Sequence, residues 1–381
     1  MILKKIKKKL QYLFKKSSQI FFFLIHGKIK SVVTPDLHDK ISVFEVKKND
    51  IVYRIFFINN GRIYTDRIDD TAFIIDNKII SGPSYQLRSK KNDKLSPRNN
   101  SKCIENSVFQ KGTPRIKKNI TGSVLSLLSG GGANNNYFHW LYDVLPRISF
   151  IDNLDLREKF PKFLLVPNYE HHFQKSTLEI LGFKKKQILN SKYIRHLSSA
   201  KIIATDHPYN ITNNVDFDHD KIPSWISDWL KNKFIKKDFT HDPGLKKIYI
   251  DRDDIDPKRN SERRITNEVE LRKFLIKRNF KFIKLNEISF RSQVNIFNNA
   301  EIIIGLHGAG FANISFCKPG TRIVEFRSKN TGRIIENIAN NNQLNFSFLE
   351  YEPKKFLDKQ KGHLEISINE VKNIIKQILN I

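Results

Sequence analysis

The sequence predicts an α/β protein with two domains and a β-rich N-terminal portion. The chain has 381 residues, which is more than one hydrophobic core usually holds. Residues 41–76 contain three strand-like runs: ISVFEV, IVYRIFF and TAFIID. Turn signals occur at Asn60-Gly61 and Asp76-Asn77. After residue 120, strand-like runs alternate with helical patterns, which is typical of parallel α/β layers.

The alternation defines the expected elements. Strands are expected at 123–129, 162–168 and 200–205, and helices at 136–147, 175–183 and 225–235. Beyond residue 246 the strands KIYIDR, KFIKL, EIIIGL and RIVEF alternate with two helices, the pattern of a nucleotide-binding doubly wound sheet. The first of these helices begins near Asn267, which has capping-box spacing with Glu270.

The stretch HDPGL, residues 241–245, is the predicted domain boundary because proline and glycine interrupt both periodicities there. The expected division is therefore a basic segment at 1–30, an N-terminal domain at 31–240 and a C-terminal domain at 241–381.

The net charge is +28, from 67 basic and 39 acidic residues, which points to an anionic partner. About half of this excess is attributed to compositional bias, since Lys, Asn, Ile and Phe are all abundant. The chain carries no helix-turn-helix, zinc-finger or RNA-binding signature, so nucleic acid is not the expected partner. The two cysteines, Cys103 and Cys317, imply no disulfide framework and fit a reducing cytosol.

The first thirty residues contain nine lysines and no acid. Leu3, Ile6, Leu10 and Leu13 recur at helical spacing between the lysines. The apolar run from Ile20 to Ile25 is too short to span a bilayer, which needs about 20 residues. We expect a basic amphipathic helix that lies on an anionic membrane surface, where each lysine adds about 1 kcal/mol. The alternative is a solvated terminus packed loosely on the body.

The segment NYFHWLYDVLPR, residues 136–147, follows three consecutive glycines, Gly130 to Gly132. As a helix it places Asn136, His139, Asp143 and Arg147 on one face. His139 and Asp143 are neighbours at i, i+4, and a carboxylate beside an imidazole is a candidate general base. Pro146 is expected to end or kink the helix, which makes Arg147 the least secure member of the face. A mixed polar surface helix is the alternative, although Tyr137 and Trp140 flank the polar stripe.

A second candidate site is EIIIGLHGAGFANISF, residues 301–316. A buried strand is expected to end at His307-Gly308-Ala309-Gly310, and a helix to open after it. Ligands of open α/β sheets bind outside the carboxyl ends of strands, and a glycine turn at a helix N-terminus offers N–H groups to an anion. Arg252 ends another strand and can hold a diphosphate bidentately, with Arg263 and Arg264 in reach. Glu325 ends a further strand, where a carboxylate can accept hydrogen bonds from ribose.

Alternatively, the carboxylates of Asp251 and Asp253 could bind a divalent metal ion that in turn binds a nucleotide diphosphate. Arg252 lies between them, and its cation makes a metal redundant. No metal and no cofactor are therefore expected.

Three segments together resemble glycosyltransferase family 61. They are NNYFHWLYDVLPRI, YIDRDD with RRITNEVEL, and SFRSQVNIFNNAEIIIGLHGAGFANISFCKPGTRIVEF. They occur in order over about residues 120–330, whereas the first 110 residues match no family. The resemblance implies a GT-B fold, with two Rossmann-like domains facing a cleft. It also implies an inverting, metal-independent hexosyl- or pentosyltransferase that uses a UDP-sugar donor, and bacterial members commonly serve capsule or other surface polysaccharide synthesis.

The resemblance assigns the acceptor to the N-terminal half and the nucleotide to the C-terminal half. It places the helix with His139 and Asp143 at the cleft, and residues 307–313 at the donor phosphates. Asp143 is the favoured base with His139 orienting it, and the reverse assignment stays open. The full set of expected binding residues follows: Asn136, Trp140 and Arg147 for the acceptor; Arg252, His307, Gly308, Ala309, Gly310, Asn313 and Glu325 for the donor.

The basic N-terminus suits a lipid-linked glycan acceptor and a cytoplasmic enzyme held at the inner face of the membrane. Two other classes of function stay open: a metal-dependent nucleotide-sugar transferase that uses Asp251 and Asp253, and a non-enzymatic basic protein that binds membranes or nucleic acid.

Overall fold

The computed structural model describes residues 2–86, 105–152, 160–212, 215–236, 245–252, 263–329, 331–353 and 362–379. The chain divides into two compact units. Unit 1 comprises Met1–Gln174 and Gly182–Asp218, and unit 2 comprises Lys175–Leu181 and His219–Ile381. Most of the predicted boundary segment, residues 241–244, lies outside the described residues. The predicted α/β class is confirmed, because both units combine β-sheets with helices.

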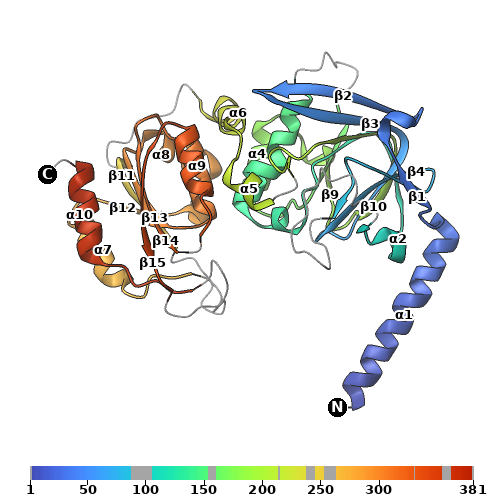
Figure 1. The fold of residues 1–381 in the computed structure, drawn as a ribbon, viewed down its shortest axis with the longest axis horizontal. Coiled ribbons are helices and arrows are strands. Elements are labelled where there is room, and N and C mark those ends of the chain that lie inside the picture. Colours follow the sequence, from blue (N-terminus) through green and yellow to red (C-terminus); the bar gives the residue numbers. More distant parts are fainter. Residues whose placement is uncertain are drawn as a thin grey trace. The chain divides into compact units, whose positions relative to one another are not determined.

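Unit 1 is built on a mixed sheet, in which the order of the described strands is β1-β5-β4-β3-β10-β7-β8-β9, with β2 on β3 and β6 on β4 (Figure 1). Its strands are β1 (Ser31–Val33), β2 (Ile41–Lys48), β3 (Ile51–Thr65), β4 (Asp70–Ile75), β5 (Lys78–Ile80), β6 (Tyr85–Gln86), β7 (Lys118–Ser126), β8 (Phe163–Val166), β9 (Ile188–Asn190) and β10 (His196–Thr205).

The sheet of unit 1 has an antiparallel half and a parallel half. β2, β3 and β4, which correspond to the three strand-like runs predicted in the N-terminal portion, pair antiparallel. β10, β7, β8 and β9 pair parallel. The turn predicted at Asp76-Asn77 is present, with positive φ at both residues. The turn predicted at Asn60-Gly61 is wrong, because β3 continues through both residues and pairs with β10 at Asn59 and at Gly61.

The core of unit 1 forms where the two halves of the sheet meet. Apolar side chains of β3, β4, β7, β8 and β10 make one buried cluster there. Phe56, Ile58 and Ile202 are typical members, and each is almost fully buried. Burial of this kind contributes about 1.5–3 kcal/mol for each large apolar side chain. The rigid sheet then fixes the segments that follow its strands.

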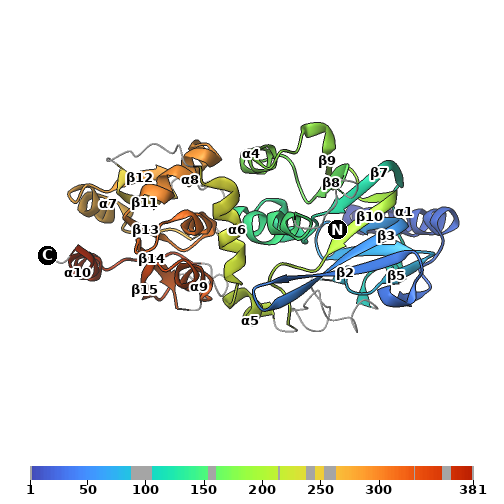
Figure 2. The ribbon, with the colours of Figure 1, turned by 90° about the horizontal axis from the view of Figure 1, so that it is seen from above.

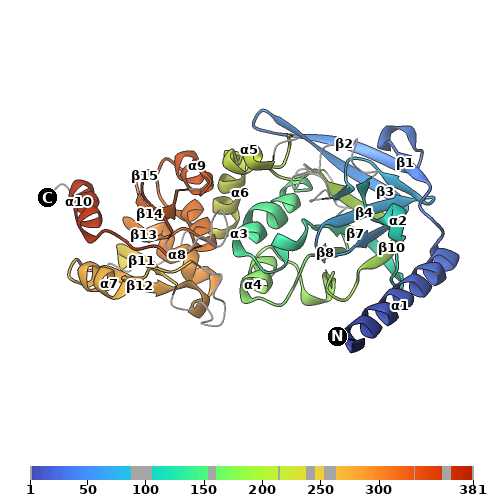
Figure 3. The same ribbon diagram turned by 60° about the horizontal axis from the view of Figure 1, so that its bottom comes forward.

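The helices of unit 1 lie before and between the strands. They are α1 (Ile2–His26), α2 (Val108–Lys111) and α3 (Tyr137–His139). Two further helices belong to both units: α4 (His172–Ile180) has its first three residues in unit 1 and the rest in unit 2, and α5 (Val215–Asp220) runs from unit 1 into unit 2. In Figures 1 and 3, α1 runs away from the strands, and its first residues lie at the far end. Among the described residues, no helix combines the length and the hydrophobicity that a bilayer-spanning segment needs.

Unit 2 contains a parallel sheet of order β12-β11-β13-β14-β15. In Figure 2 the helices α7 and α10 cover one face of this sheet, and α8 and α9 cover the other. The described elements are α6 (Ser224–Phe234), β11 (Lys247–Asp251), α7 (Glu268–Ile276), β12 (Lys281–Lys284), α8 (Phe290–Asn299), β13 (Ile302–Leu306), β14 (Arg322–Ser328), α9 (Ile334–Asn341), β15 (Asn345–Tyr351) and α10 (Ile368–Leu379).

The strand order of unit 2 defines a topological switch point. Numbered along the chain, the order is 2-1-3-4-5, so the connections leave β11 and β13 in opposite directions. Sheets of this order bind ligands in the crevice outside the carboxyl ends of the two strands at the switch. The predicted doubly wound sheet is therefore present, and its ligand position falls after β11 and β13.

Side-chain caps differ between two helices of unit 2. Ser289 caps α8, and its hydroxyl accepts a hydrogen bond from the Ser292 N–H at 3.1 Å. The capping box predicted for Asn267 is wrong, because its side chain makes no bond to α7. Instead, the Asn267 amide donates to the Ile366 carbonyl at 2.7 Å and accepts from the Ile366 N–H at 2.9 Å. The residue ties the start of α7 to the segment before α10.

Candidate functional site

The helix that follows β7 changes its winding at the predicted site. Asn136 caps its start, since its side-chain oxygen accepts from the Phe138 N–H at 2.8 Å. Residues Tyr137–His139 are α-helical, Trp140–Val144 form a π-helix, and Leu145–Phe150 form a 3-10 helix. The kink predicted at Pro146 thus appears as a change of helix type. π-turns within helices are rare and occur frequently at functional sites.

His139 and Asp143 form a hydrogen-bonded pair on this helix. His139 Nδ1 lies 2.9 Å from Asp143 Oδ2. The side chain of His139 is 29% exposed, whereas that of Asp143 is 6% exposed. Because the carboxylate holds a proton on Nδ1, the neutral ring presents Nε2 as the basic nitrogen. The imidazole is therefore the end of the pair that an incoming substrate can reach.

The electrostatics of the pair follow from burial and from each other's charge. Burial disfavours the imidazolium, but the Asp143 carboxylate outweighs it and raises the pKa of His139 above its usual value. Burial likewise disfavours the carboxylate, but His139, followed by His207, holds the pKa of Asp143 well below its usual range. Asp143 thus stays ionised and stabilises the protonated form of His139.

Two further residues that the sequence did not single out complete this cluster. The Tyr209 hydroxyl donates to Asp143 Oδ1 at 2.7 Å, and His207 Nε2 lies 3.7 Å from Asp143 Oδ2. Both follow the end of β10 in the segment DHPYN. Burial lowers the pKa of His207 to about 4, so this ring is neutral at physiological pH. The signal was present, since β10 and β7 were both expected strands of one parallel sheet whose carboxyl ends meet at one edge.

The cluster lies at a switch point of its own. In the parallel half of the unit 1 sheet, β7 lies between β10 and β8, while the chain runs from β7 to β8 and reaches β10 last. The segments after β7 and β10 therefore flank the position where open α/β sheets bind ligands. His139 and Asp143 come from the first segment, and His207 and Tyr209 come from the second.

The residues predicted to bind the acceptor are placed differently. Trp140 is fully buried, and Arg147 is buried with its guanidinium on backbone oxygens. Arg147 Nε donates to the Asp143 carbonyl at 3.0 Å and Nη1 to the Thr205 carbonyl at 3.2 Å. Arg147 thus joins the segments after β7 and β10 beneath the cluster. Asn136 is exposed but serves as the helix cap.

In unit 2, Arg252 and His307 meet at the switch point. Arg252 follows β11 and His307 follows β13. Arg252 Nη1 donates to the His307 carbonyl at 2.9 Å. A Cβ at Gly308 would lie 2.9 Å from the same nitrogen, so a side chain there would displace the guanidinium. The predicted glycine turn is therefore present at the expected strand end, with Gly308, Ala309 and Gly310 half-buried. A 3-10 helix, Ala309–Phe316, follows it.

A second cation lies close to this turn. Burial, and next the charge of Arg252, lower the pKa of Arg263 to about 10. The buried Arg263 Nη1 has no hydrogen-bond partner in the part of the chain that the structure describes. Two guanidinium groups near one glycine turn form a site that favours an anion.

Two predicted donor residues lie inside the unit rather than at its surface. Asn313 is fully buried, and its amide donates to Gln293 Oε1 at 3.0 Å and to the Gly310 carbonyl at 3.3 Å. Glu325 is fully buried on β14 and accepts from His307 Nδ1. Asn313 therefore supports the glycine turn from beneath, and Glu325 contacts the imidazole.

The structure describes one of the two carboxylates of the alternative metal site. Asp251 is buried and paired with Arg272 on α7. Asp253 lies outside the described residues. Within the described ranges, no cluster of three or more His, Cys, Asp or Glu side chains is arranged to hold a metal ion.

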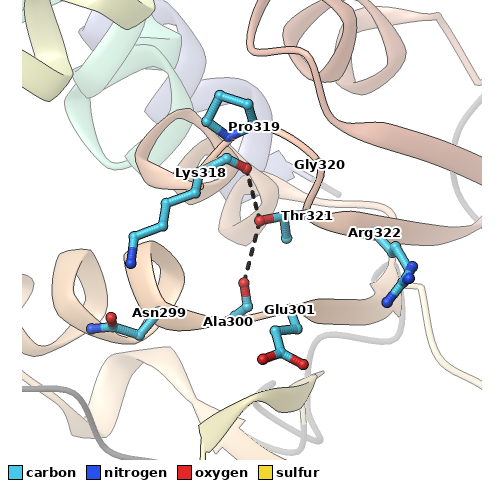
Figure 4. A pocket seen from close by; sticks show the side chains of 8 residues that line it. All are labelled: Asn299, Ala300, Glu301, Lys318, Pro319, Gly320, Thr321 and Arg322. Atoms are coloured by element: carbon cyan, nitrogen blue, oxygen red, sulfur yellow. Dashed lines mark hydrogen bonds between the residues drawn. The ribbon is translucent and has the colours of Figure 1, made fainter.

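A hollow of about 330 Å³ lies at the opposite end of the unit 2 sheet (Figure 4). Glu301 precedes β13 and Arg322 begins β14, so this hollow is at the amino ends of both strands. The Thr321 hydroxyl lies within hydrogen-bond distance of two carbonyl oxygens there, that of Lys318 at 2.8 Å and that of Ala300 at 3.2 Å, and donates its one hydrogen between them. Because ligands of such sheets bind at carboxyl ends, we do not assign it to the active site.

Comparison with known families decides the class of protein. The family model described as Glycosyltransferase 61 matches residues 137–324, from α3 into β14. The protein is a glycosyltransferase. The match covers both His139 with Asp143 in unit 1 and Arg252 with His307 in unit 2. No curated protein matches the chain significantly.

The match also removes one alternative. A non-enzymatic basic protein that only binds membranes or nucleic acid was left open by the charge of the sequence, and the glycosyltransferase match excludes it. As a glycosyltransferase, the enzyme requires a sugar donor and an acceptor.

Proposed function

We propose that this glycosyltransferase inverts the anomeric centre in one displacement, moving a hexose or pentose from a UDP-sugar to an acceptor hydroxyl. The observation that carries the proposal is the His139–Asp143 pair at the unit 1 switch point, inside the matched family segment. The acceptor proton passes to the base as the hydroxyl attacks the anomeric carbon, and UDP leaves on the opposite face. General base catalysis contributes about 10²–10⁴-fold.

The geometry favours His139 as the base and Asp143 as its orienting partner. Asp143 is nearly inaccessible, and Tyr209 and His139 occupy one oxygen each. His139 is the more exposed member, and its Nε2 lies only 3.2 Å from where a Cβ of Gly132 would be. Glycine at 132 thus keeps the approach to the imidazole open. This reverses the assignment favoured from the sequence and adopts the one that it left open.

Unit 2 is the proposed donor site. Arg252, Arg263 and the half-buried turn Gly308-Ala309-Gly310 lie at the carboxyl end of the sheet, where a diphosphate is expected. The two guanidinium groups supply the positive charge that stabilises the leaving diphosphate, a task that a divalent metal performs in other enzymes. The Asp251–Arg272 pair weighs against the metal-dependent alternative, since that carboxylate is already neutralised. We retain the GT-B arrangement, with these two sites facing one cleft, as part of the proposal.

The proposed acceptor is a glycan or a lipid-linked glycan used for a surface polysaccharide such as a capsule, and α1 supports this choice. At about 100° per residue, all but one of the exposed large hydrophobic side chains in the described part of α1 fall within an arc of roughly 140°, and Tyr12 lies outside it. The side chains within the arc are Ile6, Leu10, Leu13, Phe14, Ile20, Phe21, Leu24 and Ile25.

A different face of α1 docks on unit 1. His26 Nε2 lies 3.1 Å from the Arg115 carbonyl, its ring packs edge-on against His196, and Gln19 bonds the Gln110 carbonyl. The apolar arc therefore points away from the body, between rows of lysines. An anionic membrane surface complements both features, which supports a peripheral position at the inner face of the membrane.

A donor screen tests the proposed function. The full-length protein is incubated with each of a panel of UDP-sugars, without acceptor and with glycan or lipid-linked acceptors, and released UDP is measured. We expect one UDP-sugar to support acceptor-dependent release that persists in EDTA. Loss of all activity in EDTA, restored by a divalent cation, would establish the metal-dependent alternative instead.

A further inference from the structure

His307 and Glu325 form a buried imidazole–carboxylate pair, in which His307 follows the end of β13 and Glu325 lies in the middle of β14 and not, as the sequence predicted, at its end. Glu325 is fully buried, and its Oε1 accepts from His307 Nδ1. Its Oε2 lies 3.6 Å from Arg327 Nη1 and has no hydrogen-bond partner in the described part of the chain. Complete burial removes Glu325 from contact with a ribose. Its carboxylate acts on the imidazole instead.

The pair fixes which nitrogen of His307 can meet a ligand. Because the carboxylate holds the proton on Nδ1, the neutral ring has only a lone pair at Nε2. His307 keeps 7% of its surface exposed, and no described residue bonds Nε2. A lone pair repels a phosphate oxygen. Only the imidazolium, which carries a proton on each nitrogen, can donate to a bound phosphate.

The charges around His307 keep it neutral before a ligand binds. Burial lowers its pKa, and the cations Arg263 and Arg252 lower it further, although the Glu325 carboxylate opposes them. Arg327, behind Glu325 on β14, also bonds Glu350. The site of free protein thus holds two guanidinium groups, a neutral imidazole and one carboxylate that is shared with Arg327. A bound phosphate anion raises the pKa of His307, because its negative charge offsets the two guanidinium charges and stabilises the protonated imidazole.

We propose that His307 takes up a proton from solvent when a nucleoside diphosphate binds, and that the resulting imidazolium donates from Nε2 to a phosphate oxygen. Glu325 is the positioning residue that fixes the ring and stabilises its charge. The inference rests on the proposed donor site and names the group that meets the growing charge on the leaving diphosphate. No oxidant or second reactant is involved, since the only transfer is one proton between solvent and Nε2.

Titration calorimetry with UDP in buffers of different ionisation enthalpy tests this, because the buffer-dependent heat counts the protons taken up. Near neutral pH we expect wild-type protein to take up about 0.5–1 proton on binding UDP. Glu325→Gln and His307→Asn are expected to remove this uptake and to weaken UDP binding about tenfold. Ionisation of UDP itself is common to all variants, so the difference between them belongs to the protein.

Glu350→Gln is the matched control. Glu350 bonds Arg327 from β15 without contacting His307, so its loss changes the same charge network but leaves the proton uptake as in wild type. Melting curves establish whether each variant is folded. If Glu325→Gln is unfolded, proton uptake is compared between wild-type protein and His307→Asn only. UDP binding without proton uptake in wild type, or with equal uptake in His307→Asn, overturns the inference and leaves the donor site standing. No UDP binding by wild-type protein overturns the donor site as well.

Discussion

The hydroxyl of Tyr209 donates a hydrogen bond to the carboxylate of Asp143 across 2.7 Å, which joins the segment after β10 to the helix after β7. The two residues are 66 positions apart in the sequence, and both are buried. The bond leaves one oxygen of Asp143 for His139. The carboxylate is thereby held in one orientation before any substrate arrives, which is the preorganisation that base catalysis requires.

The pH dependence of transfer follows from the Asp143–His139 pair. The base must be neutral to accept a proton, so kcat/KM should rise with pH through the pKa of His139. Asp143 raises that pKa, so the acid limb of the profile is expected above the ordinary imidazole value of about 6.5.

Asp143→Asn removes the negative charge beside His139, while the imidazole of His139 remains buried. Burial alone lowers the pKa of this imidazole. The acid limb of the variant's residual activity should therefore move to lower pH. An acid limb that stays in place in Asp143→Asn would show that another group is titrating.

Arg252 is expected to govern donor affinity. Arg252→Ala should raise the Kd for UDP about 10- to 100-fold, since each hydrogen bond to a charged group contributes about 1.5–3 kcal/mol. Arg322→Ala is the control, because Arg322 lies on the same sheet at the amino end of β14 and should leave the Kd unchanged. Equal weakening by both variants would mean that general positive charge, rather than the glycine turn site, binds the nucleotide.

The apolar arc of α1 is expected to bind anionic membranes. Wild-type protein should float with vesicles that contain an anionic phospholipid, bind neutral vesicles weakly, and lose binding as salt screens the lysines. The double variant Leu10→Ser with Leu13→Ser should reduce partitioning at least about tenfold, because two buried leucines are lost.

Leu37→Ser provides the comparison, since Leu37 is an exposed leucine as well but lies outside α1. Flotation of the double variant at the wild-type level would contradict the membrane role of α1.

The parallel part of the fold could be predicted from the sequence because its signals are local. A buried strand such as EIIIGL carries its own evidence in a run of branched apolar residues, and the turn after it was placed correctly at His307 and Gly308. The turn predicted at Asn60-Gly61 was wrong because this dipeptide, which is common in tight turns, can also lie within a long strand. Here Asn60 adopts a positive φ inside β3. Local sequence preference cannot distinguish a turn from a continuous strand at this position, because the pairing of β3 with β10 determines the conformation.

The site could be predicted only where its members are close in sequence. His139 and Asp143 were found because they are four residues apart on one helix. Tyr209 and His207 were missed because their role depends on strand order, which brings β10 beside β7. Glu325 was identified, but its complete burial against His307 depends on side-chain packing that no spacing reveals. Similarly, Trp140 was expected to flank the polar stripe, but it is fully buried at the start of the π-helix Trp140–Val144, whose winding no spacing reveals.

The central claim is that His139 performs the proton transfer while unit 2 binds the nucleotide, and one comparison tests it most directly. Transfer rate and UDP affinity are measured for His139→Asn, with His171→Asn as the control, since His171 bonds Asn135 in the same unit and does not contact Asp143. We predict that His139→Asn loses about 10²–10⁴-fold in kcat at unchanged UDP affinity, and that His171→Asn keeps both. Retention of most activity by His139→Asn, or a parallel loss of UDP binding, would contradict the account.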